Sequence, residues 1–159
     1  MDRKLLEIYL QDHLAGSVAG LELARRAAGS NRDGPYGAEL AEIRDAIDEH
    51  RQILLSVARE LGVGPSRVKD APAWIGEKLG RLKLNGRITG YSPLSRLLEL
   101  EGLFLGLSGQ IRLWNALGTV AASHGRIGQA DPGEMAARTE RLCERVAALH
   151  ARAAGDAFA

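Results

Sequence analysis

The chain has 159 residues, and its 21 basic and 20 acidic residues leave a formal net charge of +1, which excludes a global field that attracts nucleic acid or an anionic membrane. This length fits a single domain, residues 1–159, and the lone Cys143 excludes an internal disulfide, so we expect a cytoplasmic protein. No apolar run is long enough for a membrane span, and the two Trp, three Tyr and two Phe offer few platforms for stacking bases, so we expect neither a membrane span nor a nucleic-acid partner.

Two long helices are predicted in the first half of the chain. The first runs from Asp2, a suitable N-cap, to Gly29, where a cluster of Gly, Asn, Asp and Pro breaks it. The second runs from Pro35 to Leu61 and ends at Gly62, because glycine favours the left-handed conformation that follows many helices. The short link between the two helices allows only an antiparallel hairpin.

Each of these helices carries a histidine on its apolar stripe. Apolar side chains recur at spacings of three and four along both helices, and His13 and His50 take positions within that pattern. The first stripe also contains Gly16 and Gly20, each of which lowers helix propensity by about 1 kcal/mol relative to alanine. We therefore expect another backbone to approach the first helix closely at these glycines.

Residues 62–92 are predicted to form a long crossover that contains one short amphipathic helix. A helix of about 25 residues is roughly 38 Å long, so a connection of this length carries the chain back along the bundle. The third helix then runs from Ser92 to about residue 122, and the fourth from Asp131 to about residue 156. The second and third helices should run parallel, and the third and fourth should form an antiparallel hairpin. This all-α arrangement is the topology of a ferritin-like four-helix bundle.

The third helix is apolar around most of its circumference. Leucines occupy several of its faces, so the helix should be buried on more than one side. Either the crossover covers its outer face or a second subunit does. Together with the glycine-rich face of the first helix, this apolar surface leads us to expect a homodimer.

Three short stretches give a further indication of the fold. They are the run from Tyr9 to His13 with the glycines that follow it, the sequence AWIGEKLGRLK at residues 73–83, and the helix start SPLSR at residues 92–96. In these stretches the chain resembles an uncharacterised bacterial ferritin-like family whose four-helix bundles have no assigned activity. The resemblance extends over nearly the whole chain, and it implies a ferritin-like fold more than a function.

A two-metal site of the ferritin type is not expected, because such a site needs a Glu-x-x-His pair on each of two helices. Residue 47 is Ile and residue 147 is Ala, so neither His50 nor His150 has a glutamate three residues earlier. A looser set of polar residues lies near the apolar stripes of the first three helices. Its members are Asp12, His13, His50 and Glu101. Two imidazoles and one carboxylate of this set define a candidate site for a single iron, zinc or manganese ion.

The same residues allow two other interpretations. In the one that we favour, Glu101 accepts hydrogen bonds from His13 or His50 in a buried network, because a buried carboxylate without a partner is costly. In the other, at least one of these side chains faces solvent. Most of the remaining charged residues, including Arg26 and Glu99, are expected on solvated faces or in local pairs.

The crossover region is basic. Between residues 65 and 96, seven basic residues stand against two acidic ones, which gives a local net charge of +5. The basic residues are Arg67, Lys69, Lys78, Arg81, Lys83, Arg87 and Arg96. In the simplest interpretation their aliphatic stems cover apolar faces of the bundle. The functional interpretation is a patch that binds an acidic protein or a phosphate-bearing partner.

These patterns favour a non-enzymatic helical bundle that associates with itself or with a partner and needs no cofactor. The alternative is a ferritin-like metal-binding or oxidative protein with a mononuclear site in the bundle core.

Overall fold

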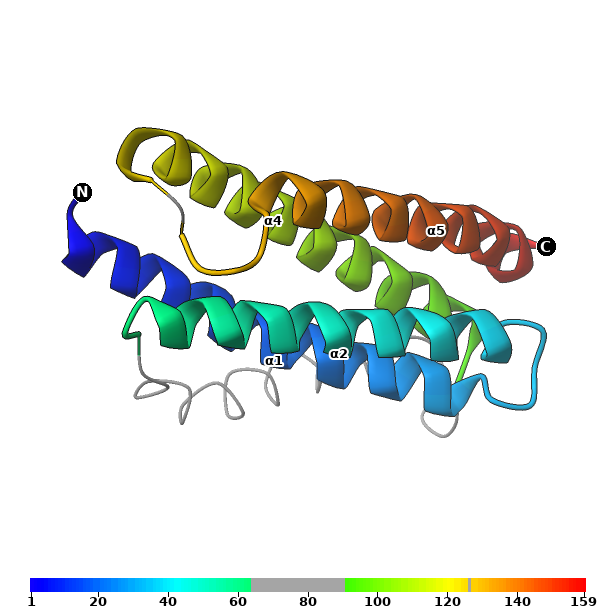
Figure 1. Ribbon diagram of the computed structural model, residues 1–159. Helices are drawn as coiled ribbons and strands as arrows, with labels where there is room; N and C mark the ends of the chain where they lie inside the picture. Colours follow the sequence, from blue (N-terminus) through cyan, green and yellow to red (C-terminus); the bar gives the residue numbers. More distant parts are fainter. Residues whose placement is uncertain (64–90, 126) are drawn as a thin grey trace.

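The structure is a computed structural model that describes residues 1–63, 91–125 and 127–159 (Figure 1). The described residues form four long helices and no strand, which confirms the all-α class. The helices are α1 (Arg3–Ser30), α2 (Gly37–Glu60), α4 (Pro93–His124) and α5 (Pro132–Phe158). Each predicted helix therefore exists, with ends within two residues of those expected. The short helix expected within the crossover lies outside the described residues.

The helices form two antiparallel hairpins, α1 with α2 and α4 with α5, while α2 and α4 run in the same direction (Figure 1). Hydrogen bonds that join the helix ends agree with this arrangement. The Asn31 side chain, just after α1, lies 2.7 Å from the Tyr91 hydroxyl just before α4. Tyr36, just before α2, donates to Asp156 near the end of α5 at 2.7 Å. These directions are the ones expected from the unequal lengths of the connections.

Side-chain caps fix where three of the helices begin. The carboxylates of Asp2 and Asp131 accept backbone N–H groups at the starts of α1 and α5, and the Ser92 hydroxyl does the same for α4. At the end of α2, Gly62 has a φ of 74°, the left-handed conformation expected there. Local sequence therefore determines most helix boundaries in this fold.

Helix α4 packs most extensively on α5 and also packs against α1. Its first half contributes Leu100, Leu103 and Leu107 to one buried cluster, and its second half contributes Trp114 to another. At Gly102 of α4 an added Cβ atom would lie 2.8 Å from a methyl carbon of Leu23, so α1 and α4 lie close together there. Apart from the atoms of its own stretch of helix, no atom of the described residues lies within 4 Å of a Cβ added at Gly16 or Gly20 of α1, so the close approach predicted there is not observed among these residues.

A fully buried carboxylate lies where α4 starts to run along α1. Glu99 has no exposed surface, although it was expected on a solvated face or in a local pair. Its Oε1 atom lies 2.7 Å from Nε of Arg26 on α1, and its Oε2 atom accepts a hydrogen bond of 2.8 Å from the Tyr91 hydroxyl. The expectation for Glu99 and Arg26 is thus wrong. On a helix that is apolar all round, the sequence does not reveal which face is buried.

The partners of Glu99 continue into a chain of hydrogen bonds, which we call the polar network. Its members are Arg26, Asn31, Tyr91, Arg96 and Glu99. The Arg96 guanidinium can only donate, so the Asn31 oxygen accepts from it at 2.8 Å. The Asn31 amide nitrogen then donates to the Tyr91 oxygen, whose single hydrogen is left for Glu99. The direction of every bond is fixed, and the chain ends on Glu99 as an acceptor.

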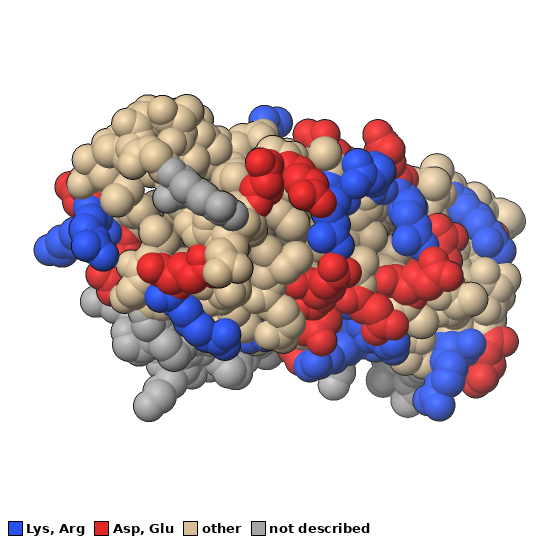
Figure 2. All heavy atoms as spheres, in the orientation of Figure 1, with Lys and Arg blue, Asp and Glu red and all other residues tan. Residues whose placement is uncertain are grey.

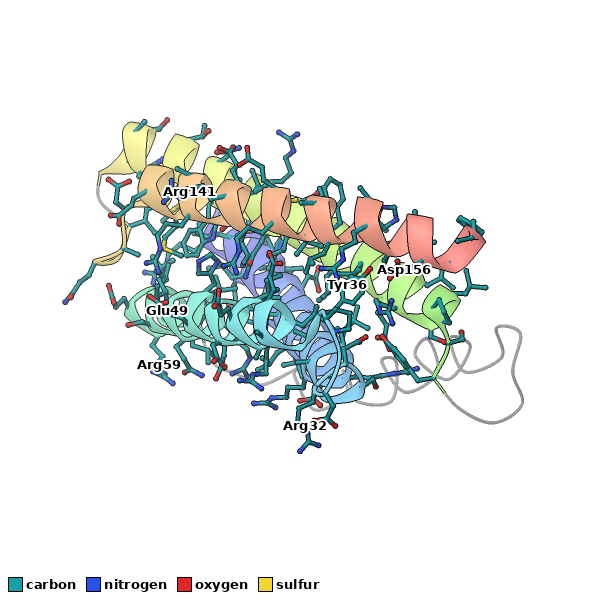
Figure 3. All side chains as sticks on the ribbon, turned by 90° about the vertical axis from the view of Figure 1, so that its right-hand side faces the viewer. Arg32, Tyr36, Glu49, Arg59, Arg141 and Asp156 are labelled. Carbon is teal, nitrogen blue, oxygen red and sulfur yellow. The ribbon has the colours of Figure 1, made fainter. Side chains whose placement is uncertain are left out.

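Burial has the largest effect on the ionisable groups of the polar network, and the groups next to Glu99 oppose it only in part. Burial raises the pKa of the Glu99 carboxyl, whereas the Tyr91 hydroxyl and the Arg26 guanidinium oppose this rise. Burial and the adjacent Glu99 carboxylate also raise the pKa of Tyr91, so its phenol keeps the proton that it donates. The network extends to the bundle end, where Arg96 lies 4.2 Å from the ring centre of Tyr36 and Arg152 lies 4.4 Å from it. Tyr36 and Asp156 point toward one another there (Figure 3).

Tyr91→Phe is expected to lower the free energy of unfolding by about 1–3 kcal/mol, because it leaves the buried Oε2 atom of Glu99 without the hydrogen-bond donor that Tyr91 supplies. Urea denaturation of the purified variant measures this loss. The matched control is Tyr9→Phe, since the Tyr9 hydroxyl makes no hydrogen bond with the residues that the structure describes. Equal stabilities of the two variants would show that the Tyr91 hydrogen bond contributes nothing.

Candidate functional site

The four predicted metal ligands lie in different surroundings. Asp12 is exposed, and His13 is half-buried with its ring edge-on to Tyr9, at 4.6 Å between ring centres. His50 is buried, with 2% of its surface exposed. Glu101 is exposed, and its Oε1 atom lies 3.2 Å from Nε2 of His150 on α5.

The predicted single-metal site is therefore not assembled. No group of three or more His, Cys, Asp or Glu side chains that could hold a metal ion occurs among the described residues. The favoured network is also wrong in its members, because Glu101 pairs with His150 and with neither His13 nor His50. The sequence does not show which histidine pairs with Glu101, since the pairing depends on how α5 is rotated about its axis relative to α4.

His50 lies at the seam between α2 and α5. Its Nδ1 atom is 3.4 Å from the hydroxyl oxygen of Thr139, which itself donates to the Met135 carbonyl at 2.7 Å. Because that hydroxyl has only one hydrogen, the contact requires His50 to donate from Nδ1. Burial lowers the pKa of His50, the nearby Arg138 charge lowers it further, and Glu49 opposes both effects. His50 is thus a neutral, hydrogen-bonded core residue.

Ion pairs cover the same seam on the outside. Arg138 on α5 lies 2.6 Å from Glu49 on α2, and Arg145 lies 2.7 Å from Glu42. Figure 2 shows basic and acidic side chains side by side where the two helices meet. Because these charged side chains pair with one another, the seam is not a candidate site for a ligand.

The predicted basic patch is described at one position only. Six of its seven members, all between residues 67 and 87, lie outside the described residues. Arg96 donates to Asn31, pairs with Asp156 at 3.2 Å and stacks on Tyr36. Arg96 is therefore part of the bundle end. Its charge, which was expected to meet an acidic partner, is paired with Asp156 of the same chain.

A glycine-walled cavity of about 290 Å³ opens between α1 and α4. Its walls include Gly16 and Gly20 of α1 and Gly106 and Gly109 of α4, and its rim includes Leu105. A Cβ atom at any of these four glycines would have no atom of the described residues within 4 Å apart from those of its own stretch of helix. The glycines thus leave a recess on the surface instead of a close helix contact.

A second hollow, of about 440 Å³, lies between α4 and α5 on the other side of Leu105. We call the surface around it the α4 outer face, which consists of Glu101, Phe104, Leu105, Ala147 and His150. Leu105 is 70% exposed and Phe104 is 39% exposed. Large apolar side chains that project beside a hollow are typical of a surface that binds another protein. The α4 outer face is the candidate functional site.

No protein-family model matches this chain, and no curated protein or solved structure matches it either. The resemblance to a ferritin-like family therefore stays a prediction. Within residues 1–63, 91–125 and 127–159, the structure contains no helix with the length and apolar character needed to cross a membrane. The function has to be inferred from the geometry of the described surface.

The lowered pKa of His50 predicts a specific pH dependence of stability. The unfolded chain takes up a proton near the ordinary value of 6.5, while the folded chain does so only at lower pH. The contribution of a neutral His50 is therefore present above about pH 6.5 and is lost as the pH falls toward the lowered pKa. His50→Leu should show a smaller drop in the free energy of unfolding between about pH 7.5 and pH 5 than the wild type.

Chemical denaturation at a series of pH values measures this drop. His124→Gln, which removes an exposed imidazole at the end of α4, is the control and should follow the wild type. The account of His50 is contradicted if His50→Leu loses as much stability as the wild type over the same pH interval.

Proposed function

We propose that this protein is a non-enzymatic helical bundle that associates with a second copy of itself through the α4 outer face. The observation that carries the proposal is the exposure of Leu105 and Phe104 on α4, beside two recesses. Burial of one such side chain stabilises an interface by about 1.5–3 kcal/mol, and a two-fold interface buries each side chain twice.

The arrangement around Leu105 suits a self-complementary contact. A two-fold interface brings the same patch of both copies together, so a projecting side chain must find a hollow close to its own position. Leu105 lies on the rim of both the glycine-walled cavity and the hollow of the α4 outer face. Near the two-fold axis, Leu105 of each copy can therefore enter a recess of the other.

We further infer that the bundle is ferritin-like. Two antiparallel hairpins with α2 parallel to α4 support this inference, because that order requires one long connection, as in ferritin-like folds. The inference concerns architecture alone and assigns no metal, since the four predicted ligands do not come together.

Leu105→Glu is expected to convert the dimer to a monomer, because two carboxylates would then meet near the two-fold axis without partners. Light scattering coupled to size-exclusion chromatography at micromolar concentration measures the mass. Leu5→Glu is the matched control, since Leu5 is also largely exposed, at 64%, but lies at the start of α1. This control should remain a dimer.

Two results would contradict the proposal. A wild-type chain that is monomeric at these concentrations removes the basis for self-association. A dimer that survives Leu105→Glu and dissociates on Leu5→Glu places the interface on the N-terminal part of α1 instead.

A further inference from the structure

We propose that the His150–Glu101 pair is one half of a zinc site that two copies of the chain complete together. The inference rests on the proposed function, because it places the pair near the two-fold axis of the dimer. The ion would be held by Nε2 of His150 and Oε1 of Glu101 from each copy.

The ligand atoms of His150 and Glu101 already have the spacing that a zinc ion requires. Zinc binds histidine nitrogen and carboxylate oxygen at about 2.0–2.2 Å in tetrahedral geometry, so two neighbouring ligand atoms lie roughly 3.3 Å apart. Nε2 of His150 and Oε1 of Glu101 are 3.2 Å apart. The hydrogen-bonded pair therefore already has the spacing of one edge of a zinc tetrahedron. Zinc can take the place of the hydrogen on Nε2 without moving either helix, because that proton leaves Nε2 and His150 binds as the neutral imidazole that carries its hydrogen on Nδ1.

The His150–Glu101 pair lies on two long helices that are packed against each other. Glu101 and His150 each lie about two turns inside the nearer end of α4 and α5, and these two helices pack more extensively on each other than any other pair. Both side chains are partly exposed, with 49% and 34% of their side-chain surfaces accessible. They are held in place by their backbones and still open to an ion from solvent.

One chain alone cannot complete the zinc site. A structural zinc ion takes four protein ligands, and the pair supplies two. No third His, Cys, Asp or Glu joins the pair among the described residues. The rest of the hollow is lined by Phe104, Leu105 and Ala147, which supply no ligand. A second copy related by a two-fold axis supplies one more imidazole and one more carboxylate, which gives a His₂Glu₂ site.

The apolar residues around the pair have a role in this arrangement. When two copies meet, Phe104 and Leu105 of both chains exclude water from around the ion. The two carboxylates cancel the charge of Zn²⁺, so the closed site is neutral. Without the ion, two Glu101 carboxylates near one axis repel each other, so zinc should favour the dimer.

The experiment measures zinc uptake and mass on the same full-length protein. Zinc chloride is titrated into metal-free protein in competition with a chromophoric chelator, and light scattering gives the mass in EDTA and at saturating zinc. We expect saturation at about half an equivalent of zinc per chain, since two chains share one ion. Glu101→Gln and His150→Gln should each abolish this uptake. His124→Gln, which removes an exposed histidine elsewhere on α4, should bind zinc as the wild type does.

The possible results separate this inference from the proposed function. A dimer in EDTA that takes up no zinc, or whose uptake survives both substitutions, shows that the pair is only hydrogen-bonded, and it leaves the proposed function intact. Saturation at one equivalent per chain, or unchanged uptake by the monomeric Leu105→Glu variant, also overturns the shared site. A wild-type chain that is monomeric both in EDTA and with zinc overturns both. Half an equivalent together with a dimer supports both.

Discussion

The burial of one carboxylate, Glu99, constrains the rest of this bundle. A charged group without exposed surface must be paired and hydrogen-bonded, or the fold loses several kcal/mol. Arg26 supplies the charge from α1, and Tyr91 supplies a hydrogen bond from the segment before α4. Because Arg96 and Asn31 orient Tyr91 through bonds of fixed direction, the end of α1 and the start of α4 have one mutual arrangement. The polar network thus specifies how the two hairpins meet.

The burial of Glu99 determines which face of α4 remains for contacts with another molecule. Because Glu99 faces α1 and the leucines of both clusters are buried, the part of the α4 surface that lies between α1 and α5 faces outward. Gly102 brings α1 and α4 together, while Gly106 and Gly109 leave a recess on the same helix. Leu105 projects beside that recess from a helix that is fixed on two sides. Because the backbone of α4 is already held by its neighbours, it needs no further ordering when Leu105 binds, which favours association through this face.

The sequence predicted what depends on local chemistry and chain length. Caps such as Asp2 and Ser92 placed the helix starts, because side chains bind backbone groups three or fewer residues away. The long connection placed α2 parallel to α4, and the recurrence of apolar residues at spacings of three and four placed His50 in the core. The partners of Glu99 and Glu101 could not be predicted in this way. They depend on the rotation of each helix about its axis, which periodicity does not determine for a helix that is apolar all round.

The central claim is that α4 turns an apolar face toward a second copy. Site-specific photo-crosslinking tests it most directly, with a benzophenone amino acid in place of Leu105 and, as a control, in place of the exposed Asp45 on α2. We predict that irradiation at micromolar concentration yields a covalent dimer from position 105, with crosslinks that map to α4 and α5 of the other copy, and no dimer from position 45. Crosslinks from position 105 that stay within one chain, or equal dimer yields from the two positions, would contradict the account.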